Sequence, residues 1–194
     1  MSKKEEILRA AAYLFATKGF KEASMAEVAA MTATAGSNIF YHFKTKEEIF
    51  LSVLKTIRDD MLLKMENLLG GRQFACGMNM IEHLVASYLG MAESNPHWFM
   101  LLHRSYPHEL AAVNPSCRES LAAIYEGFID LFERAIRIGQ EDGSVAEGSA
   151  RKKAMVVFAM VDGVVRFDTH HLYEAGALYD ELMTSCRRML KRDA

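Results

Sequence analysis

Histidine and cysteine are the residue types best suited to bind a metal, and the sequence contains seven histidines and three cysteines. No histidine has a metal-binding spacing such as HExxH, and the adjacent His170 and His171 would point about 100° apart on a helix. Cys76, Cys117 and Cys186 are far apart in the sequence and form no CxxC motif, which indicates reduced thiols in a cytosol. We therefore predict no metal, no cofactor and a cytoplasmic protein.

Catalytic motifs are also missing from the sequence. It contains no GxSxG, no glycine-rich phosphate loop after a strand and no Cys–His pair in a predicted cleft. Asp168 and His170 are close in the sequence, but we interpret them as polar groups of a surface or a pocket. We predict that the protein is not an enzyme.

The stretch 24–46, SMAEVAAMTATAGSNIFYHFKTK, carries two helix-start signals. Ser24 with Glu27 and Thr45 with Glu48 have the spacing of a capping box, in which the hydroxyl accepts from a backbone amide and the carboxylate reaches back. Between them lie a turn of small residues and a short segment that ends in Tyr41-His42-Phe43. The stretch thus predicts a short helix, a turn, a second short helix and then a capped longer helix. This is a helix-turn-helix pattern, so the first hypothesis for function is DNA binding.

The composition favours an all-helical fold. Only three prolines and twelve glycines stand against many good helix formers, and no region alternates polar and apolar residues over several strands. Periodicity and stop signals predict helices from about 3 to 18, after Ser24, over two turns before Phe43, and at 45–69, 74–93, 97–104, 116–140, 149–172 and 175–191. Pro107 and Pro115 are expected to punctuate the region between the helices at 97–104 and 116–140.

The strings AAxxLFxxKGFxxxSMxEVA and SNIFYHFKTKEEIF resemble the N-terminal domain of the TetR family of bacterial transcriptional regulators. The resemblance is specific over residues 5–60 and architectural beyond residue 70. It implies a three-helix helix-turn-helix DNA-binding domain at 1–61, joined by a long fourth helix to a helical effector-binding and dimerisation domain at 62–194. It also implies a homodimer that acts as a repressor. Such a dimer leaves a palindromic operator when a small molecule binds.

The resemblance also assigns candidate DNA contacts. Ser24 begins the second helix, Tyr41 and His42 occupy positions that contact backbone or bases, and Lys46 resembles a phosphate-binding lysine, with Lys44 at a commonly basic position. Ser37 and Asn38 open the recognition helix, and Asn38 is able to pair with adenine through two hydrogen bonds. Two positions depart from the family: Ala33 and Thr34 replace the usual Gly and Val of the turn, and Phe40 replaces a common Tyr.

The effector site and the dimer interface are predicted in the second domain. The expected pocket residues, which suit a mainly apolar or aromatic effector, are Trp98, Phe99, His103, Phe128, Met160, Phe167 and His170. The predicted helix at 149–172 is apolar nearly all round apart from Asp162 and Arg166, which are four residues apart and able to pair. Such a helix needs cover on every face, so residues 150–191 are expected to form the subunit interface.

The net charge is distributed unevenly along the chain. The first 46 residues carry seven Lys or Arg and four Glu, a net charge of +3, whereas the whole chain has −2. The N-terminal segment is thus the part that could approach phosphates. No stretch is apolar enough to span a membrane.

The alternative to a DNA-binding regulator is a helical adaptor or ligand-binding protein that does not bind DNA.

Overall fold

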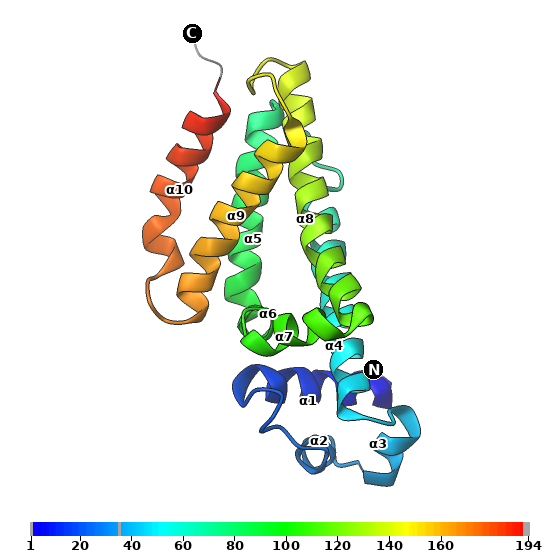
Figure 1. The fold of residues 1–194 in the computed structure, drawn as a ribbon. Coiled ribbons are helices and arrows are strands. Elements are labelled where there is room, and N and C mark those ends of the chain that lie inside the picture. The colour runs from blue at the N-terminus through cyan, green and yellow to red at the C-terminus, as the bar shows by residue number, and fades with distance from the viewer. Residues whose placement is uncertain (1, 35, 192–194) are drawn as a thin grey trace. The chain divides into compact units, whose positions relative to one another are not determined.

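The computed structural model describes residues 2–34 and 36–191. Their secondary structure is entirely helical, which confirms the predicted fold class (Figure 1). The helices are α1 (Lys3–Thr17), α2 (Met25–Met31), α3 (Gly36–His42), α4 (Lys46–Leu69), α5 (Gly77–Ser94), α6 (Pro96–Leu102), α7 (Ser105–Val113), α8 (Pro115–Glu141), α9 (Ala150–Thr169) and α10 (Ala175–Leu190). None of these helices is both long and apolar enough to cross a bilayer.

Contacts divide the chain into two compact units. The first comprises residues 1–60 and 95–123, and the second comprises residues 61–94 and 124–194. The division of α4 lies beside the predicted domain boundary at 61/62, but residues 95–123 pack with the N-terminal helices. Packing alone does not define a functional domain, so the predicted boundary stays a prediction.

The first unit is held together by an aromatic cluster and by polar contacts from α6 and α7. The ring of Phe50 lies 5.5 Å from that of Phe15 and 5.4 Å from that of Phe20, and Phe20 stacks on Tyr106 at 3.9 Å. Arg104 donates to the carbonyls of Ala16 at 2.7 Å and Thr17 at 2.8 Å. Because the last carbonyls of a helix lack intrahelical donors, this guanidinium completes the C-terminal end of α1.

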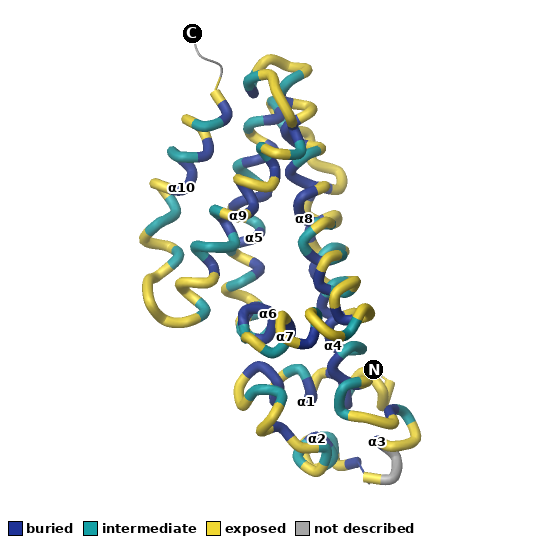
Figure 2. Tube along the Cα trace, in the orientation of Figure 1, coloured by how far each residue is buried: buried dark blue, intermediate teal, exposed yellow. Residues whose placement is uncertain are grey.

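The second unit is built on the close crossing of α5 and α8, where Gly77 meets the backbone of Gly139, and on the packing of α9 and α10 against α5. Its core is formed by buried side chains of α4, α5, α8 and α9, namely Met61, Met65, Ile81, Leu84, Tyr88, Phe128, Phe132, Ile136, Val157, Phe158 and Val161. Figure 2 shows the buried positions of α8 recurring along one face and exposed positions along the other. This is the amphipathic pattern that periodicity predicted for this helix.

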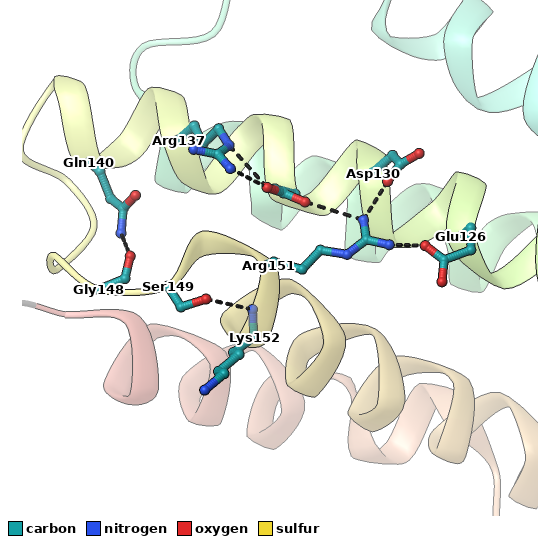
Figure 3. Close-up of polar contacts among 9 residues, drawn as sticks. Glu126, Asp130, Arg137, Gln140, Gly148, Ser149, Arg151 and Lys152 are labelled. Carbon is teal, nitrogen blue, oxygen red and sulfur yellow. Dashed lines mark hydrogen bonds and ion pairs between the residues drawn. The ribbon is translucent and has the colours of Figure 1, made fainter.

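An ion-pair network fixes the first turn of α9 on α8 (Figure 3). Arg151 pairs with Glu126 and Asp130 and lies 3.2 Å from a carboxylate oxygen of Glu133. Arg137 pairs with the same Glu133 from the next turn of α8. Ser149 caps α9 as expected, since its hydroxyl accepts from the backbone amide of Lys152.

Three helix boundaries differ from the sequence predictions. Helix α5 begins at Gly77 instead of Phe74, because its first amides are satisfied by remote groups: Gly77 N donates to Asp142 at 2.7 Å and Met78 N to Ser144 at 3.1 Å. The predicted helix at 97–104 ends at Leu102, and α9 ends at Thr169, short of Leu172.

Helix α7 was not predicted at all. Pro107 was expected to punctuate this region, but it lies in the first turn of α7. The missing N–H of proline costs nothing there, because the first amides of a helix have no intrahelical acceptor.

Candidate nucleic-acid interface

Helix α3 divides its side chains between the core and the solvent. The sequence predicted that Ile39, Phe40 and Phe43 anchor this helix. Ile39, and Phe43 directly after the helix, are buried, with 0% and 1% of their surface exposed, but the prediction is wrong for Phe40, which faces solvent. Phe40 and Tyr41 lie between them and are 51% and 77% exposed. Aromatic side chains exposed to this degree on a helix with anchored neighbours are available for contact with a partner.

The predicted cap of α2 is present in full. The Ser24 hydroxyl accepts from Glu27 N at 3.2 Å, and the Glu27 carboxylate accepts from Ser24 N at 2.9 Å. Hydrogen bonds from Lys18 first, and then from the backbone and hydroxyl of Ser24, lower the pKa of Glu27 to about 2. The carboxylate is therefore charged at neutral pH, and Ser24 is held at the solvent-exposed start of α2.

The second predicted cap differs in one bond. Thr45 accepts from Glu48 N at 3.0 Å as expected, but the Glu48 carboxylate accepts from Lys44 N at 2.7 Å instead of the amide of Thr45. The ammonium of Lys44 in turn donates to the carbonyl of Phe40 at 3.2 Å. Lys44 thus joins the end of α3 to the start of α4, while its side chain stays exposed.

Lys46 occupies the junction of three segments of the first unit. Its ammonium donates to the carbonyls of Ala23 at 2.9 Å and Lys21 at 3.2 Å, and it lies 4.5 Å from the centre of the Phe20 ring. A lysine ammonium has three donors, so two carbonyls orient the group and leave a third proton for a phosphate oxygen. The charge is held beside Ser24, the other predicted phosphate contact.

The remaining predicted DNA contacts are described less completely. His42 is half-buried, and its ring lies 5.2 Å from that of Tyr41. Ser37 and Asn38 belong to α3 by their backbone, but their side chains lie outside what the structure describes, as does residue 35. The assignment of Ser24, Ser37, Asn38, Tyr41, His42, Lys44 and Lys46 to DNA binding stays a prediction.

The predicted effector residues are distributed over both units. Trp98, Phe99 and His103 belong to the first, where the rings of buried Phe99 and His103 lie 6.1 Å apart. Phe128 is fully buried in the second unit, whereas Met160 is half-buried and Phe167 and His170 are exposed at the end of α9. Their common pocket stays a prediction. The described residues include no group of three or more His, Cys, Asp or Glu side chains placed to hold a metal ion.

Sequence reasoning missed that the second unit brings together the side chains of Tyr88, Tyr125 and Phe158, and it missed the acceptor role of Asp162. The hydroxyl of Tyr88 donates to Asp162 at 2.7 Å across 74 residues of sequence. Asp162 was expected only as one of two charged residues in an apolar helix, able to pair with Arg166, and that exception to the hydrophobic pattern was the signal available. The identity of its partner was not contained in the spacing.

Comparison with known proteins relates these features to a family. Residues 7–53, which include most of α1, all of α2 and α3 and the start of α4, match the family described as bacterial regulatory proteins, tetR family. The match covers the helix-turn-helix region of that family, and this part of the chain is similar to the DNA-binding region of TetR-family regulators.

Relatives of the TetR family match the chain over most of its length. The HTH-type transcriptional regulator QacR of Staphylococcus aureus is 23% identical over 170 residues, which are 88% of this chain and 87% of QacR. A transcriptional regulator from Saccharomonospora viridis, solved in complex with choline, has a TM-score of 0.85 at 18% identity and covers 98% of both chains. The regulator FadR of Bacillus subtilis, solved with stearoyl-CoA, has a TM-score of 0.76 at 19% identity, with 94% and 96% of the two chains covered. At these identities the structures establish a shared fold.

The turn between α2 and α3 explains one departure from the TetR family pattern. Ala33, at the position where the family usually carries Gly, has a φ of 46°. This left-handed conformation costs an L-residue with a Cβ roughly 1–2 kcal/mol, and glycine does not bear this cost.

Replacing Ala33 with glycine is therefore expected to stabilise the protein by up to about 1 kcal/mol, despite the greater entropy of glycine in the unfolded chain. Thermal unfolding measures the change, and Ala30→Gly, within α2, is the matched control that should destabilise. A lower melting temperature for Ala33→Gly would contradict the strain assigned to this turn.

Proposed function

We propose that this chain is a repressor of the TetR family that binds a palindromic operator as a homodimer and is released by a small, mainly apolar or aromatic molecule bound in residues 62–194. The proposed DNA contacts are those predicted from the sequence: Ser24, Ser37, Asn38, Tyr41, His42, Lys44 and Lys46. Residues 150–191 are proposed to join the subunits.

The observation that carries the DNA-binding proposal is the division of α3. Buried Ile39 and Phe43 hold the helix from one side, and exposed Phe40 and Tyr41 are offered on the other. A recognition helix of this kind inserts its exposed face into the major groove, and phosphate contacts from the flanking segments fix its position. Ser24 and Lys46, held close together by the contact of Lys46 with Ala23, suit that second role.

A homodimer suits the proposed palindromic operator, and the exposed face of α9 supports it. Two recognition helices on one face of DNA lie about 34–36 Å apart, one helical turn, so one subunit reads one half-site of a palindrome. Helix α9 exposes Met155, Val156 and Phe167, each more than 40% accessible in the single chain. An apolar stripe of this size is typical of a surface that a partner covers.

The effector is not defined by the relatives, because choline and stearoyl-CoA, found with two of them, differ in size and charge. The class of effector therefore has to be inferred from the residues of this chain. The half-buried predicted pocket residue Met160 supports an apolar ligand body, since methionine side chains adapt to such ligands.

Selection from random double-stranded DNA at low salt tests the proposed function. The purified full chain should enrich a palindrome whose half-sites are about one helical turn apart. Enrichment of a single unpaired half-site would contradict the dimeric arrangement. No enrichment at all would refute DNA binding and favour the helical adaptor.

Replacing Lys46 with alanine is expected to weaken binding to all DNA sequences and to reduce the salt dependence of binding. Loss of one phosphate contact should change the slope of log K against log salt concentration by about 0.9 per subunit. Fluorescence anisotropy with the selected operator and with unrelated DNA measures both quantities.

Lys55→Ala is the matched control for Lys46→Ala, because Lys55 is an exposed lysine farther along α4. It should leave the slope unchanged. A loss of affinity in Lys46→Ala with an unchanged slope would show that Lys46 only holds the loop at Lys21 and Ala23, and would contradict its phosphate contact.

A further inference from the structure

Asn114 connects three helices of the first unit. It lies directly after α7 and directly before α8. Its backbone amide donates to the carbonyl of Leu110 at 2.7 Å, and its side-chain oxygen accepts from Cys117 N at 3.0 Å, as in the cap of a helix. The nitrogen of the same side chain donates to the carboxylate of Glu47 at 2.7 Å, in the first turn of α4. One side chain thus caps α8 and binds a carboxylate of α4.

The carboxylate of Glu47 is directed toward α7 and the start of α8. Burial, followed by the negative charge of Glu47, raises the pKa of Tyr106 in α7 to about 12. The same two causes raise the pKa of the Cys117 thiol in α8 to about 11. Both groups lie with Asn114 on one side of α4, so the charge of half-buried Glu47 is held on that side.

Lys46, the proposed phosphate contact, directly precedes Glu47. Its ammonium binds two backbone carbonyls, which orient the group without neutralising its charge. A carboxylate can reach a cation that directly precedes it in this helix, because Arg58 pairs with Asp59 at 2.7 Å. Glu47 would therefore compete with phosphate for Lys46 if its carboxylate were not bound elsewhere.

Two further carboxylates near Lys46 are also bound by other groups. Glu27 accepts from the backbone amide of Ser24 at 2.9 Å, and Glu48 accepts from that of Lys44 at 2.7 Å. These two bonds form within four residues of sequence. Glu47 differs because its partner is supplied from 67 positions away.

The cap of α8 alone does not explain an asparagine at position 114. Aspartate and serine cap helices about as well as asparagine. Asparagine also carries a separate NH2 group that only donates, and at this place the group binds Glu47. An aspartate would cap α8 but would repel the carboxylate of Glu47.

We propose that Asn114 is a positioning residue for the DNA-binding surface: it holds the carboxylate of Glu47 toward α7 and α8, so that the charge of Lys46 stays available to a phosphate group of DNA. The inference rests on the proposed function, because it adds a residue far outside the helix-turn-helix to the phosphate contact of Lys46. Without the NH2 group of Asn114, Glu47 pairs with Lys46, and this ion pair replaces the phosphate contact.

The exchange of partners is measured on the full chain without DNA. Asn114→Asp keeps the acceptor that caps α8 and removes the donor to Glu47. Nitrogen-15 NMR of the lysine ammonium groups should show a shifted Lys46 resonance, which is assigned by its absence in Lys46→Ala. Adding Glu47→Gln exchanges amide and carboxylate between the two positions and should return the resonance to its parent value. An unchanged Lys46 resonance in Asn114→Asp overturns the proposal, whether or not the protein binds DNA.

Fluorescence anisotropy measures the consequence for DNA binding. Asn114→Asp should weaken binding at least about tenfold, the loss expected for one charge-assisted contact. It should also change the slope of log K against log salt concentration by about 0.9 per subunit, as Lys46→Ala does. The double variant with Glu47→Gln should recover both quantities, which a general loss of stability would not allow.

An unchanged slope in Asn114→Asp, or no recovery in the double variant, overturns the proposal. A parent protein that binds no DNA refutes the proposed function instead, and the Lys46 resonance then still decides whether Asn114 controls the partner of Glu47.

Two further variants complete the test. Asn67→Asp is the matched control, because it adds the same charge at an exposed asparagine farther along α4. It should leave the resonance, the affinity and the slope unchanged, and a loss of affinity there would assign the effect to net charge and overturn the proposal. Asn114→Ser keeps the test valid if Asn114→Asp fails to fold, since serine still caps α8 and adds no charge. An unchanged resonance and slope in folded Asn114→Ser contradict the proposal.

Discussion

Replacing Gly77 with alanine is expected to destabilise the protein by about 3 kcal/mol or more, the upper range for overpacking a tight interface. A Cβ on Gly77 would lie 2.1 Å from the backbone nitrogen of Gly139, 2.3 Å from its Cα and 2.6 Å from the carbonyl oxygen of Ala135. All three atoms belong to the backbone of α8, so no side-chain rotation relieves the overlap. The two helices must move apart where they cross. The hydrogen bonds from the backbone amides of Gly77 to Asp142 and of Met78 to Ser144 must then lengthen.

Gly90→Ala is the matched control for Gly77→Ala in the same helix. A Cβ on Gly90 meets no atom within 4 Å, so only helix propensity changes and the variant should be more stable by up to about 1 kcal/mol. Urea unfolding followed by circular dichroism measures both changes. If Gly77→Ala were as stable as the parent protein, the close crossing of α5 and α8 would be contradicted.

The local signals of the first unit were sufficient for prediction because they act over a few residues. The Ser24 cap depends on Glu27 three positions away, and the stop after α1 depends on Gly19, whose φ of 89° suits glycine alone. Ile39 and Phe43, two of the three expected anchors of α3, are buried and lie four residues apart, whereas the third, Phe40, is exposed. In each case the partner group lies within one helical turn, where sequence spacing determines geometry.

The features that the sequence did not reveal depend on groups brought together from afar. The start of α5 is set by Asp142 and Ser144, more than 60 residues later. The end of α1 is completed by Arg104, and Asp162 receives its hydrogen bond from Tyr88. Propensity and periodicity describe one helix at a time, so they cannot identify a partner on another helix.

The contacts of Lys46 show why a site residue can be located without its role being defined. Its place at the start of α4 was evident from the sequence, but its ammonium also binds the carbonyls of Lys21 and Ala23 and contacts Phe20. Phe20 in turn stacks on Tyr106 of α7. Lys46 thus has two possible roles, a phosphate contact and a contact that supports the packing of Phe20 on α7. The slope of log K against log salt concentration in Lys46→Ala distinguishes them.

The exposed face of α9 carries apolar residues that nothing within the described part of the single chain covers. Ala154, Val157, Val161 and Val165 face the core, whereas the exposed Met155, Val156, Ala159 and Phe167 recur on the other side. Gly163 lies on that same side, and a Cβ there would meet no atom of the chain within 4 Å. A small residue without a close neighbour in its own chain is explained if a second copy of α9 approaches there.

Replacing both Met155 and Val156 with glutamate is therefore expected to convert a homodimer into a monomer at micromolar concentration. Paired helices would place four carboxylates in an apolar contact, where charges are costly to bury. Each monomer would then hold one half-site alone, and affinity for the palindromic operator should fall by about 10²–10⁴-fold, the loss expected when two linked contacts are separated.

Analytical ultracentrifugation measures the mass of the double variant, and anisotropy measures its binding to the operator. Leu63→Glu is the control, because Leu63 is 60% exposed on α4, outside the proposed interface, and should leave both quantities unchanged. The two measurements also separate the subunit interface from the reading helix. A double variant that stays dimeric would place the interface elsewhere, whereas a monomer with full operator affinity would mean that one subunit suffices to bind DNA.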